Sequence, residues 1–360
     1  MYLCGKRKVM AQIVSQPAAT CFSSAIGELV FSTNAEEGTL VLDLICNGTR
    51  INLLEETLYP DIDSTIRVTD VESMVEPYVK RYLQVSMECT FTDTSGSVSI
   101  TPVTVLYAMA DVDTTASSFL QNHFLSILDG EKMTAAGREE RIHAYGANAL
   151  AVTADVKLAN GEYDTLTATL TAMDHDGSVY HFDVSPDNII SLLALTDQQL
   201  LAYTVTADLR TQRFRMVEEK TIPAPSLMFI NSFGYEEFIH CVGTHKKDSK
   251  YDRKATRVKG RLRNYQITED RQFSANTGWL NEAMADWADD LFRSDSVFLW
   301  IDGTAGREVV LSDSKSEITN EDDFMPAFEF TYTYAQRIHN VMQSGRVGRI
   351  FDNTFDHTFN

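Results

Sequence analysis

The sequence feature that most constrains the fold is a period-two alternation of apolar and polar residues over short runs. In AFEFTYTY at 327–334, one face carries only aromatic side chains: Phe328, Phe330, Tyr332 and Tyr334. Successive side chains of a β-strand point to opposite faces of the sheet, so this pattern predicts a half-buried strand. A chain that contains many such runs is expected to fold as packed β-sheets.

Turn-forming dipeptides separate several of these runs and predict hairpins. Asn47-Gly48 lies between two apolar runs, and Asn160-Gly161 lies between two alternating runs. Asn-Gly is favoured in two-residue hairpin turns because both central residues need positive φ. We therefore predict an antiparallel hairpin at each position.

Two segments have a helical period instead. Residues 116–130 place apolar side chains and His123 on one stripe, which predicts a helix with a packed, structural histidine. Residues 277–293 give the clearer pattern, with four apolar residues on one stripe: Leu280, Met284, Trp287 and Leu291. Thr277 is the expected N-cap of this second helix. Its acidic residues are expected to face solvent: Glu282, Asp286, Asp289 and Asp290.

The order of these patterns predicts a mainly β fold built from multi-domain β-sandwiches. The chain has 360 residues, more than the roughly 250–300 at which single hydrophobic cores stop growing. Pro223 and Pro225 indicate a linker. The predicted domains are a β-sandwich at 1–110, a mixed β-sandwich at 111–222 with the helix at 116–130, a β-sandwich or small barrel at 223–345 flanked by the helix at 277–293, and a C-terminal arm at 346–360.

The charge of the chain is unevenly distributed. The net charge is −20, yet residues 246–263 hold nine basic and two acidic residues, which leaves −27 for the remainder. An acidic balance disfavours general nucleic-acid binding. Three interpretations of the basic stretch stay open: a solvated hairpin, a contact with an acidic surface of another subunit, or phosphate binding. Its candidate contact residues are Lys246, Lys247, Lys250, Arg253, Lys254 and Arg257.

No motif in the sequence carries recognisable chemistry. Phosphate loops, Gly-x-Ser-x-Gly, His-Glu-x-x-His and Cys-x-x-Cys are all absent, and the five cysteines lie far apart. His240, Cys241 and His245 are close in sequence, but 240 and 241 would point to opposite faces of a strand. We predict no catalytic residue, no metal and no cofactor. No run of about 18 apolar residues exists, so no membrane partner is expected.

The last residues, RIFDNTFDHTFN, repeat Phe at a spacing of four: Phe351, Phe355 and Phe359. This spacing puts the three rings on one face of a helix or of a strand. Gly345 and Gly348 precede the repeat and favour an arm. We expect the arm to insert its Phe side chains into a neighbouring subunit or to add a strand to its sheet edge. The alternative is a tail folded back on its own domain.

Several segments of the C-terminal third resemble a known group of proteins. They are FINSFGYEEFIHCVGT, the basic stretch with Arg257 and Gly260, NTGWLNEAMADWADDLFRSDSVFLWIDG, and FEFTYTYAQRIHN. Together they resemble virion tail proteins of phages that infect Bacteroidetes-type gut bacteria, whose chains similarly end in Phe-Asp repeats. The N-terminal sandwiches resemble that group only in the general pattern of their residues. The order of a basic strand, a helix, a tight Asp-Gly turn and an aromatic strand is also similar to that of tail-tube and distal-tail proteins.

The resemblance implies a structural role without an enzymatic activity. It implies a homo-oligomeric ring, hub or baseplate component that contacts other tail proteins, made in the host cytoplasm and located in the virion. Its third domain would be tail-tube-like, and DNA would be a partner only in passing through the assembly. The alternative is a carbohydrate-binding or adhesive β-sandwich protein. For that alternative Trp279 is the exposed aromatic candidate, because Trp287 and Trp300 are expected in the core.

Overall fold

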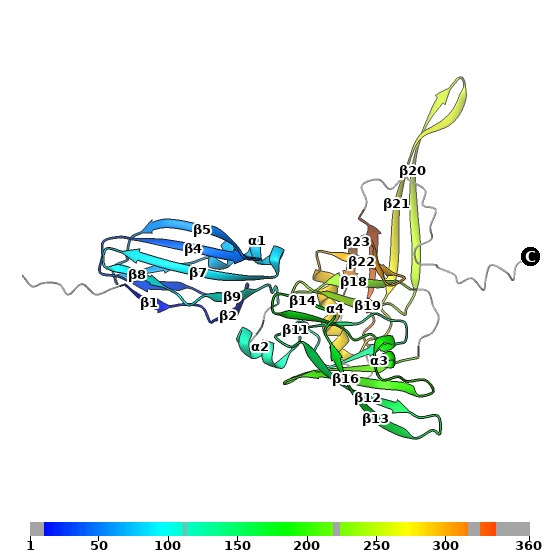
Figure 1. Ribbon diagram of the computed structural model, residues 1–360. Helices are drawn as coiled ribbons and strands as arrows, with labels where there is room; N and C mark the ends of the chain where they lie inside the picture. Colours follow the sequence, from blue (N-terminus) through cyan, green and yellow to red (C-terminus); the bar gives the residue numbers. More distant parts are fainter. Residues whose placement is uncertain (1–10, 111, 113, 219–223, 316–324, 336–360) are drawn as a thin grey trace, which may run out of the picture. The chain divides into compact units, whose positions relative to one another are not determined.

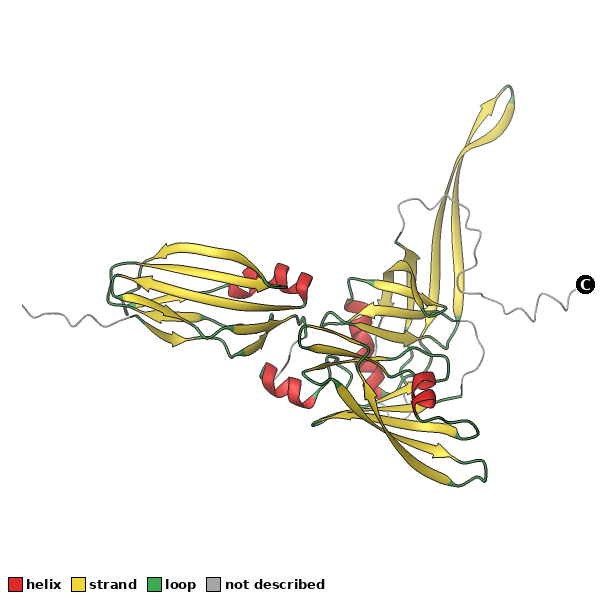
Figure 2. Cartoon of the chain, in the orientation of Figure 1, coloured by secondary structure: helices red, strands yellow, loops and turns green. Residues whose placement is uncertain are grey.

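The computed structural model describes residues 11–335, apart from 111, 113, 219–223 and 316–324. Strands dominate these residues (Figure 2), which confirms the mainly β fold class. The chain divides into two compact units. Unit 1 comprises Met1–Asn122 and Ser232–Gly234, and unit 2 comprises His123–Asn231 and Tyr235–Asn360.

Unit 1 is a β-sandwich of two sheets. The smaller sheet has the order β1 (Gln12–Ser15), β3 (Leu29–Ser32), β6 (Thr65–Val68). The larger has the order β2 (Thr20–Phe22), β9 (Val103–Leu106), β7 (Gln84–Asp93), β4 (Gly38–Cys46), β5 (Thr49–Leu58), and β8 (Gly96–Ser99) also pairs with β7. Leucines of β4 and the stacked rings of Phe31 and Phe91, 5.4 Å apart, fill the space between the sheets. The helix α1 (Val71–Tyr82) buries Val71, Val75 and Val79 in this core.

The first predicted hairpin is confirmed. β4 and β5 pair in antiparallel register from Cys46↔Thr49 outward. Asn47 and Gly48 both have positive φ, 46° and 77°, as a two-residue hairpin turn requires.

The predicted helix at 116–130 is too long. α2 (Ala116–Asn122) ends where Asn122 donates a side-chain hydrogen bond to the Ser118 carbonyl. Beyond it, the backbone N–H of Leu125 donates to the His143 carbonyl, and Phe124 is buried in a core of unit 2. These contacts replace the next helical turn. The prediction of a packed histidine is also wrong, because His123 is exposed.

Unit 2 contains two of its three sheets in residues 131–216. The first has the order β10 (Glu131–Thr134), β17 (Arg210–Met216), β16 (Gln199–Ala207), β12 (Ala149–Lys157), β13 (Tyr163–Thr171). The second has the order β11 (Arg141–Tyr145), β15 (Val179–Asp183), β14 (Asp174–Asp176), and the helix α3 (Pro186–Leu192) follows it. The second predicted hairpin, β12–β13, is confirmed, but its loop is longer than two residues because the N–H of Leu158 donates to the Glu162 carbonyl.

The third sheet of unit 2 has seven antiparallel strands. Their order is β19 (Glu236–His240), β18 (Ser226–Ile230), β22 (Val297–Ile301), β23 (Thr304–Lys315), β24 (Glu329–Tyr334), β21 (Arg261–Asn276), β20 (His245–Val258). As predicted from AFEFTYTY, one face of β24 and the residue before it is buried: Phe328, Phe330, Tyr332 and Tyr334. The strand order is open, so the described strands form no closed barrel.

The predicted amphipathic helix is present as α4 (Glu282–Arg293), and its apolar stripe packs in the core of this sheet. Its start was predicted wrongly. Asn281 is the N-cap, accepting a 2.8 Å hydrogen bond from the N–H of Met284. Thr277 instead accepts from the N–H of Phe328 and is followed by Gly278 with φ 77°, a backbone conformation that a helix does not allow. Asp290 is buried rather than exposed to solvent.

The described residues contain three hydrophobic cores. One lies in unit 1, and unit 2 holds one core around β12 and β16 and another around α4 and the seven-stranded sheet. Because the last two lie in one compact unit, the division into domains at 110, 222 and 345 stays a prediction. No helix among the described residues is long and apolar enough to cross a membrane.

Candidate functional sites: an exposed basic hairpin and a buried ionic cluster

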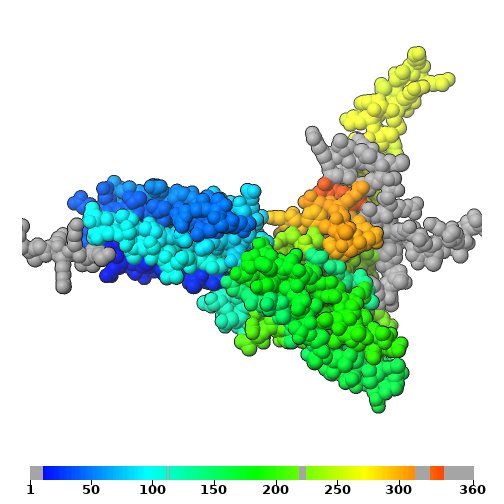
Figure 3. Space-filling model, viewed as in Figure 1, coloured from blue at the N-terminus to red at the C-terminus, as the bar shows by residue number. Residues whose placement is uncertain are grey.

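The basic stretch forms most of a long hairpin made of β20 and β21. Its turn is Lys259-Gly260, with φ of 49° and 76°. Every residue from 250 to 268 is exposed. Figure 1 shows this part of the hairpin extending beyond the other strands of its sheet, and Figure 3 shows its tip as a separate projection.

The hairpin brings the six candidate basic residues onto one ribbon but not onto one face. The alternation of β20 puts Lys247, Arg253 and Arg257 on the face that also carries Tyr251. Lys246, Lys250 and Lys254 lie on the opposite face. The same ribbon exposes five large apolar side chains, between 45% and 72% of their surface: Tyr251, Val258, Leu262, Tyr265 and Ile267.

Most charges of the hairpin have no counter-ion within the described part of the chain. Arg253 lies over the ring of Tyr251 at 5.1 Å, and the Tyr251 hydroxyl donates to Glu269 at 3.3 Å. Glu269 itself pairs with Arg271 at 2.5 Å, which lowers the pKa of Glu269 to about 2. Among the residues that the structure describes, no acidic group lies within ion-pair distance of the six candidate side chains. Their charges are therefore available to a partner.

The other sequence candidates have different positions. Phe351, Phe355 and Phe359 lie outside the described residues. Trp279 is 71% exposed, as expected, whereas Trp287 is fully buried. His240 Nε2 donates to the Glu139 carbonyl at 3.0 Å, and its Nδ1 lies 2.8 Å from Ser226 Oγ. Within the described ranges no three residues of metal-binding type come together.

Four buried charged side chains of unit 2 form an ionic cluster that sequence reasoning missed. They come from four separate segments: Lys132 in β10, Glu140 before β11, Glu237 in β19 and Asp290 in α4. None is more than 5% exposed. Charged residues scattered over about 160 positions give no sequence pattern, and such residues are normally read as solvent-exposed. They come together only in the folded structure.

Lys132 occupies the centre of this cluster. Its Nζ lies 2.6 Å from Glu140 Oε2, donates to the Phe238 carbonyl at 2.9 Å, and lies 4.2 Å from the centre of the Trp287 ring. The angle at which Lys132 Nζ approaches Glu140 Oε2 is unfavourable for a hydrogen bond. Within the described part of the structure, both Glu140 oxygens and the Thr134 hydroxyl therefore have no well-directed hydrogen-bond partner.

Glu237 is held from two sides. Its Oε1 accepts from Asn231 Nδ2 at 2.8 Å, and its Oε2 accepts from the indole N–H of Trp287. Burial raises the pKa of Glu237, and the Lys132 charge opposes that shift only in part. Burial likewise raises the pKa of Glu140 against the same opposing charge. Both carboxyl groups thus hold a proton more readily than carboxyl groups in water.

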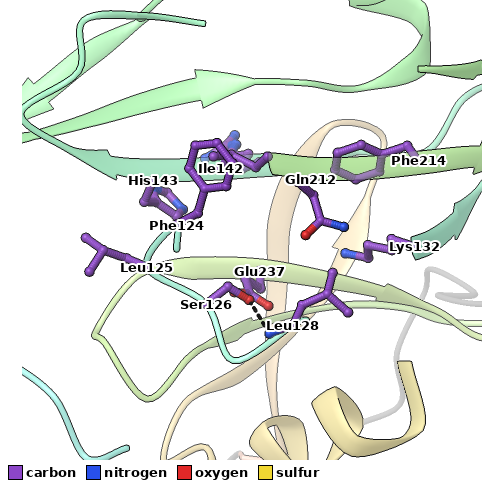
Figure 4. Close-up of a pocket in the computed structure, with 11 residues that line it drawn as sticks. Phe124, Leu125, Ser126, Leu128, Lys132, Ile142, His143, Gln212, Phe214 and Glu237 are labelled. Carbon is purple, nitrogen blue, oxygen red and sulfur yellow. Dashed lines mark hydrogen bonds between the residues drawn. The ribbon is translucent and has the colours of Figure 1, made fainter. Parts of the chain in front are cut away.

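A small cavity adjoins the cluster (Figure 4). Its volume is about 20 Å³, which is room for one water molecule. Lys132 and Glu237 both line it, together with Ser126, His143, Gln212 and Phe214.

A histidine pair lies at another wall of the same region. His143 Nδ1 and His181 Nδ1 are 2.7 Å apart, and His143 Nε2 is 2.9 Å from the Glu236 carbonyl. A carbonyl only accepts, so Nε2 of His143 carries the proton and its Nδ1 accepts from the Nδ1–H of His181. This arrangement fixes both tautomers and requires a neutral His143. Burial lowers the pKa of His143 to about 3.

Comparisons with known proteins do not assign a family. No protein family and no curated protein matches the chain. Two crystal structures of a family 64 laminaripentaose-producing β-1,3-glucanase from Paenibacillus barengoltzii, one complexed with laminarihexaose, are 10% identical to it. They align with 63% and 59% of this chain, which spans 64% and 60% of their lengths, at TM-scores of 0.13 and 0.12. At these scores the likeness carries no argument about fold or function.

Proposed function

We propose that this chain is a structural subunit of a phage tail, in a ring, hub or baseplate, that acts by self-assembly and carries no enzymatic activity. The observation that carries the proposal is the exposed β20–β21 hairpin. A two-stranded ribbon is marginally stable in water when nothing covers it. This one leaves five large apolar side chains in solvent, and a partner surface that covers them would stabilise it.

The charge of the hairpin indicates what kind of partner would fit. The hairpin stretch 246–263 carries +7 and the rest of the chain −27, so a second copy offers an acidic surface in quantity. A contact between two different surfaces of identical subunits is heterologous, and repeated rotation about an axis closes it into a ring. The C-terminal arm at 346–360 would add a second contact to a neighbouring copy, and other tail proteins would bind the finished ring.

The mass of the particle that the purified full-length chain forms in solution tests the proposal. Analytical ultracentrifugation at low salt should show a closed oligomer that weakens as salt rises, because salt screens surface charges. Lys254→Glu should weaken assembly at least tenfold, since it reverses a charge at the proposed contact. Lys157→Glu reverses an exposed charge of β12 and should leave assembly unchanged.

Two results would count against the proposal in different ways. A wild-type chain that stays monomeric under all these conditions would overturn self-assembly, and a monomer that binds oligosaccharides would support the carbohydrate-binding alternative. A wild-type oligomer that Lys254→Glu does not weaken would leave self-assembly standing and remove the hairpin as its contact.

A further inference from the structure

The Lys132–Glu140 pair is poorly explained as an ordinary buried ion pair. Removing two charges from water costs several kcal/mol per ion, and only good geometry with additional hydrogen bonds repays this cost. Here Glu140 is 1% exposed, and its two nearest donors, Lys132 Nζ and the Thr134 hydroxyl, approach its oxygens outside good hydrogen-bonding directions. The Thr134 hydroxyl has no other hydrogen-bond partner among the described residues. A neutral, covalently joined pair would relieve this cost.

We propose that Lys132 and Glu140 condense into an intramolecular amide bond, which makes this site a self-modification centre. The bond forms between Lys132 Nζ and Glu140 Cδ, and the bond between Cδ and one carboxyl oxygen breaks. That oxygen leaves as water with two protons, both from the Lys132 ammonium: Glu237 accepts the first and returns it to the leaving oxygen, and the second leaves the nitrogen as the amide forms. No oxidation state changes, so the step needs no other reactant.

The distance between the reacting atoms suits this reaction. Lys132 Nζ lies 2.6 Å from Glu140 Oε2, and Cδ is one C–O bond of about 1.2 Å further, so Nζ is at most about 3.8 Å from Cδ. Productive encounters need about 3–3.5 Å, and groups held this way react as if present at 10⁵–10⁸ M, approximate effective molarities. Lys132 and Glu140 are at most 5% exposed, so bulk solvent has little access to hydrolyse the amide.

Glu237 is the proton acceptor for the attacking amine. Both groups contact Trp287: the Lys132 ammonium lies over its ring, and Glu237 accepts from its N–H. Both also line the 20 Å³ cavity, which has room for one water to carry the proton from the amine to the carboxylate. A neutral amine is the nucleophilic form, so this transfer must precede attack.

The surroundings of Glu140 suit the charge that develops during attack. Its carbonyl oxygen becomes negative in the tetrahedral intermediate. The Arg138 guanidinium is close enough to act on the charge of Glu140, and Arg138 is only 7% exposed. The Thr134 hydroxyl can donate a hydrogen bond there, because it has no other partner among the described residues. Fixed donors of this kind stabilise an oxyanion strongly in a dry site.

The product would join two sheets of unit 2. Lys132 lies in β10, an edge strand that pairs only with β17, in parallel, among the described strands. Glu140 directly precedes β11 of the three-stranded sheet. The cross-link would anchor an edge strand whose other side is held by contacts from Asn281 and Met284 instead of by a second strand.

Intact-mass spectrometry of the purified full chain tests the proposal. We expect the wild type to be lighter than its sequence mass by one water molecule, and a proteolytic map to contain one branched peptide that joins 132 to 140. A wild-type mass equal to the full sequence mass, measured on folded protein after prolonged incubation, would overturn the proposal. This readout does not depend on oligomeric state, so it is separate from the test of self-assembly.

Three variants assign the roles within the site. Lys132→Arg should keep the full mass, while the control Lys157→Arg, on an exposed lysine of β12, should lose one water. Glu140→Gln should reach the same cross-linked mass as the wild type by losing ammonia instead. Glu237→Gln should slow the reaction at least tenfold with the ion pair in place, and an unchanged rate would remove Glu237 as the proton acceptor. If Lys132→Arg does not fold, the wild-type mass and the Glu140→Gln product still decide the outcome.

Discussion

At the residue scale, His143 makes the stability of unit 2 sensitive to acid. The unfolded chain binds a proton on this histidine near its ordinary pKa of 6.5, whereas the folded state holds its pKa at about 3. Its stabilising contribution is therefore complete above about pH 6.5 and is lost as the pH falls toward 3. The charges facing the pair come from Arg141, Asp174, Asp176 and Glu236.

Urea unfolding at several pH values measures this effect. Between about pH 6.5 and 4, the free energy of unfolding of the wild type should fall more steeply than that of His143→Gln, by up to about 1.4 kcal/mol per pH unit. Both proteins share the buried Glu237, whose raised pKa has the opposite effect on the pH dependence, so its contribution cancels in the difference. His175→Gln removes an exposed histidine and should keep the wild-type slope. Parallel wild-type and His143→Gln curves would contradict the assignment.

At the element scale, α4 depends on a cap that also connects it to another sheet. Asn281 caps the helix at Met284 N and donates from its side-chain amide to the Glu131 carbonyl of β10 at 2.7 Å. Asn281→Ala should therefore reduce the free energy of unfolding by about 1–2 kcal/mol, toward the upper end for caps. Thermal or urea unfolding checks this. Asp286→Ala, exposed on the same helix, is the control and should change it little.

Strands and hairpins were the predictable elements, because their signals are local. A few consecutive residues determine both the aromatic face of 327–334 and the Asn47-Gly48 turn. Helix ends were not predictable, because competing contacts decide them. Thr277 is a good cap by type, but it binds Phe328 instead, and Leu125 leaves the predicted helix to bond His143.

The ionic cluster was beyond sequence reasoning for a different reason. Its four charged residues come from distant segments, and Asp290 sits among acidic neighbours on a helix where charge normally means exposure. The basic hairpin was found because nine cations within 246–263 stand out in an acidic chain. Composition therefore identified the exposed candidate and could not identify the buried one.

At the scale of the whole molecule, the proposed assembly separates folding from association. Deleting residues 346–360 should leave the melting temperature within a few degrees of the wild type. The same deletion should lower the affinity between subunits at least tenfold or abolish the oligomer. Sedimentation together with circular dichroism distinguishes the two effects. Truncation after Asn353 keeps Phe351 and should give an intermediate loss. Full assembly of the shorter chain would contradict a role for the arm.

Unit 1 is built from two separate stretches of the chain, and this limits how early it can finish folding during synthesis. Its segment Ser232–Gly234 supplies Phe233, whose ring lies 5.7 Å from Phe22 and 5.2 Å from Phe119. The ribosome makes this segment about 110 residues after Asn122, a delay of roughly 5–20 s at usual elongation rates. Until then Phe22 and Phe119 lack one of their partners. The aromatic contacts of unit 1 can therefore be completed only after Phe233 has been synthesised, well after the rest of the unit.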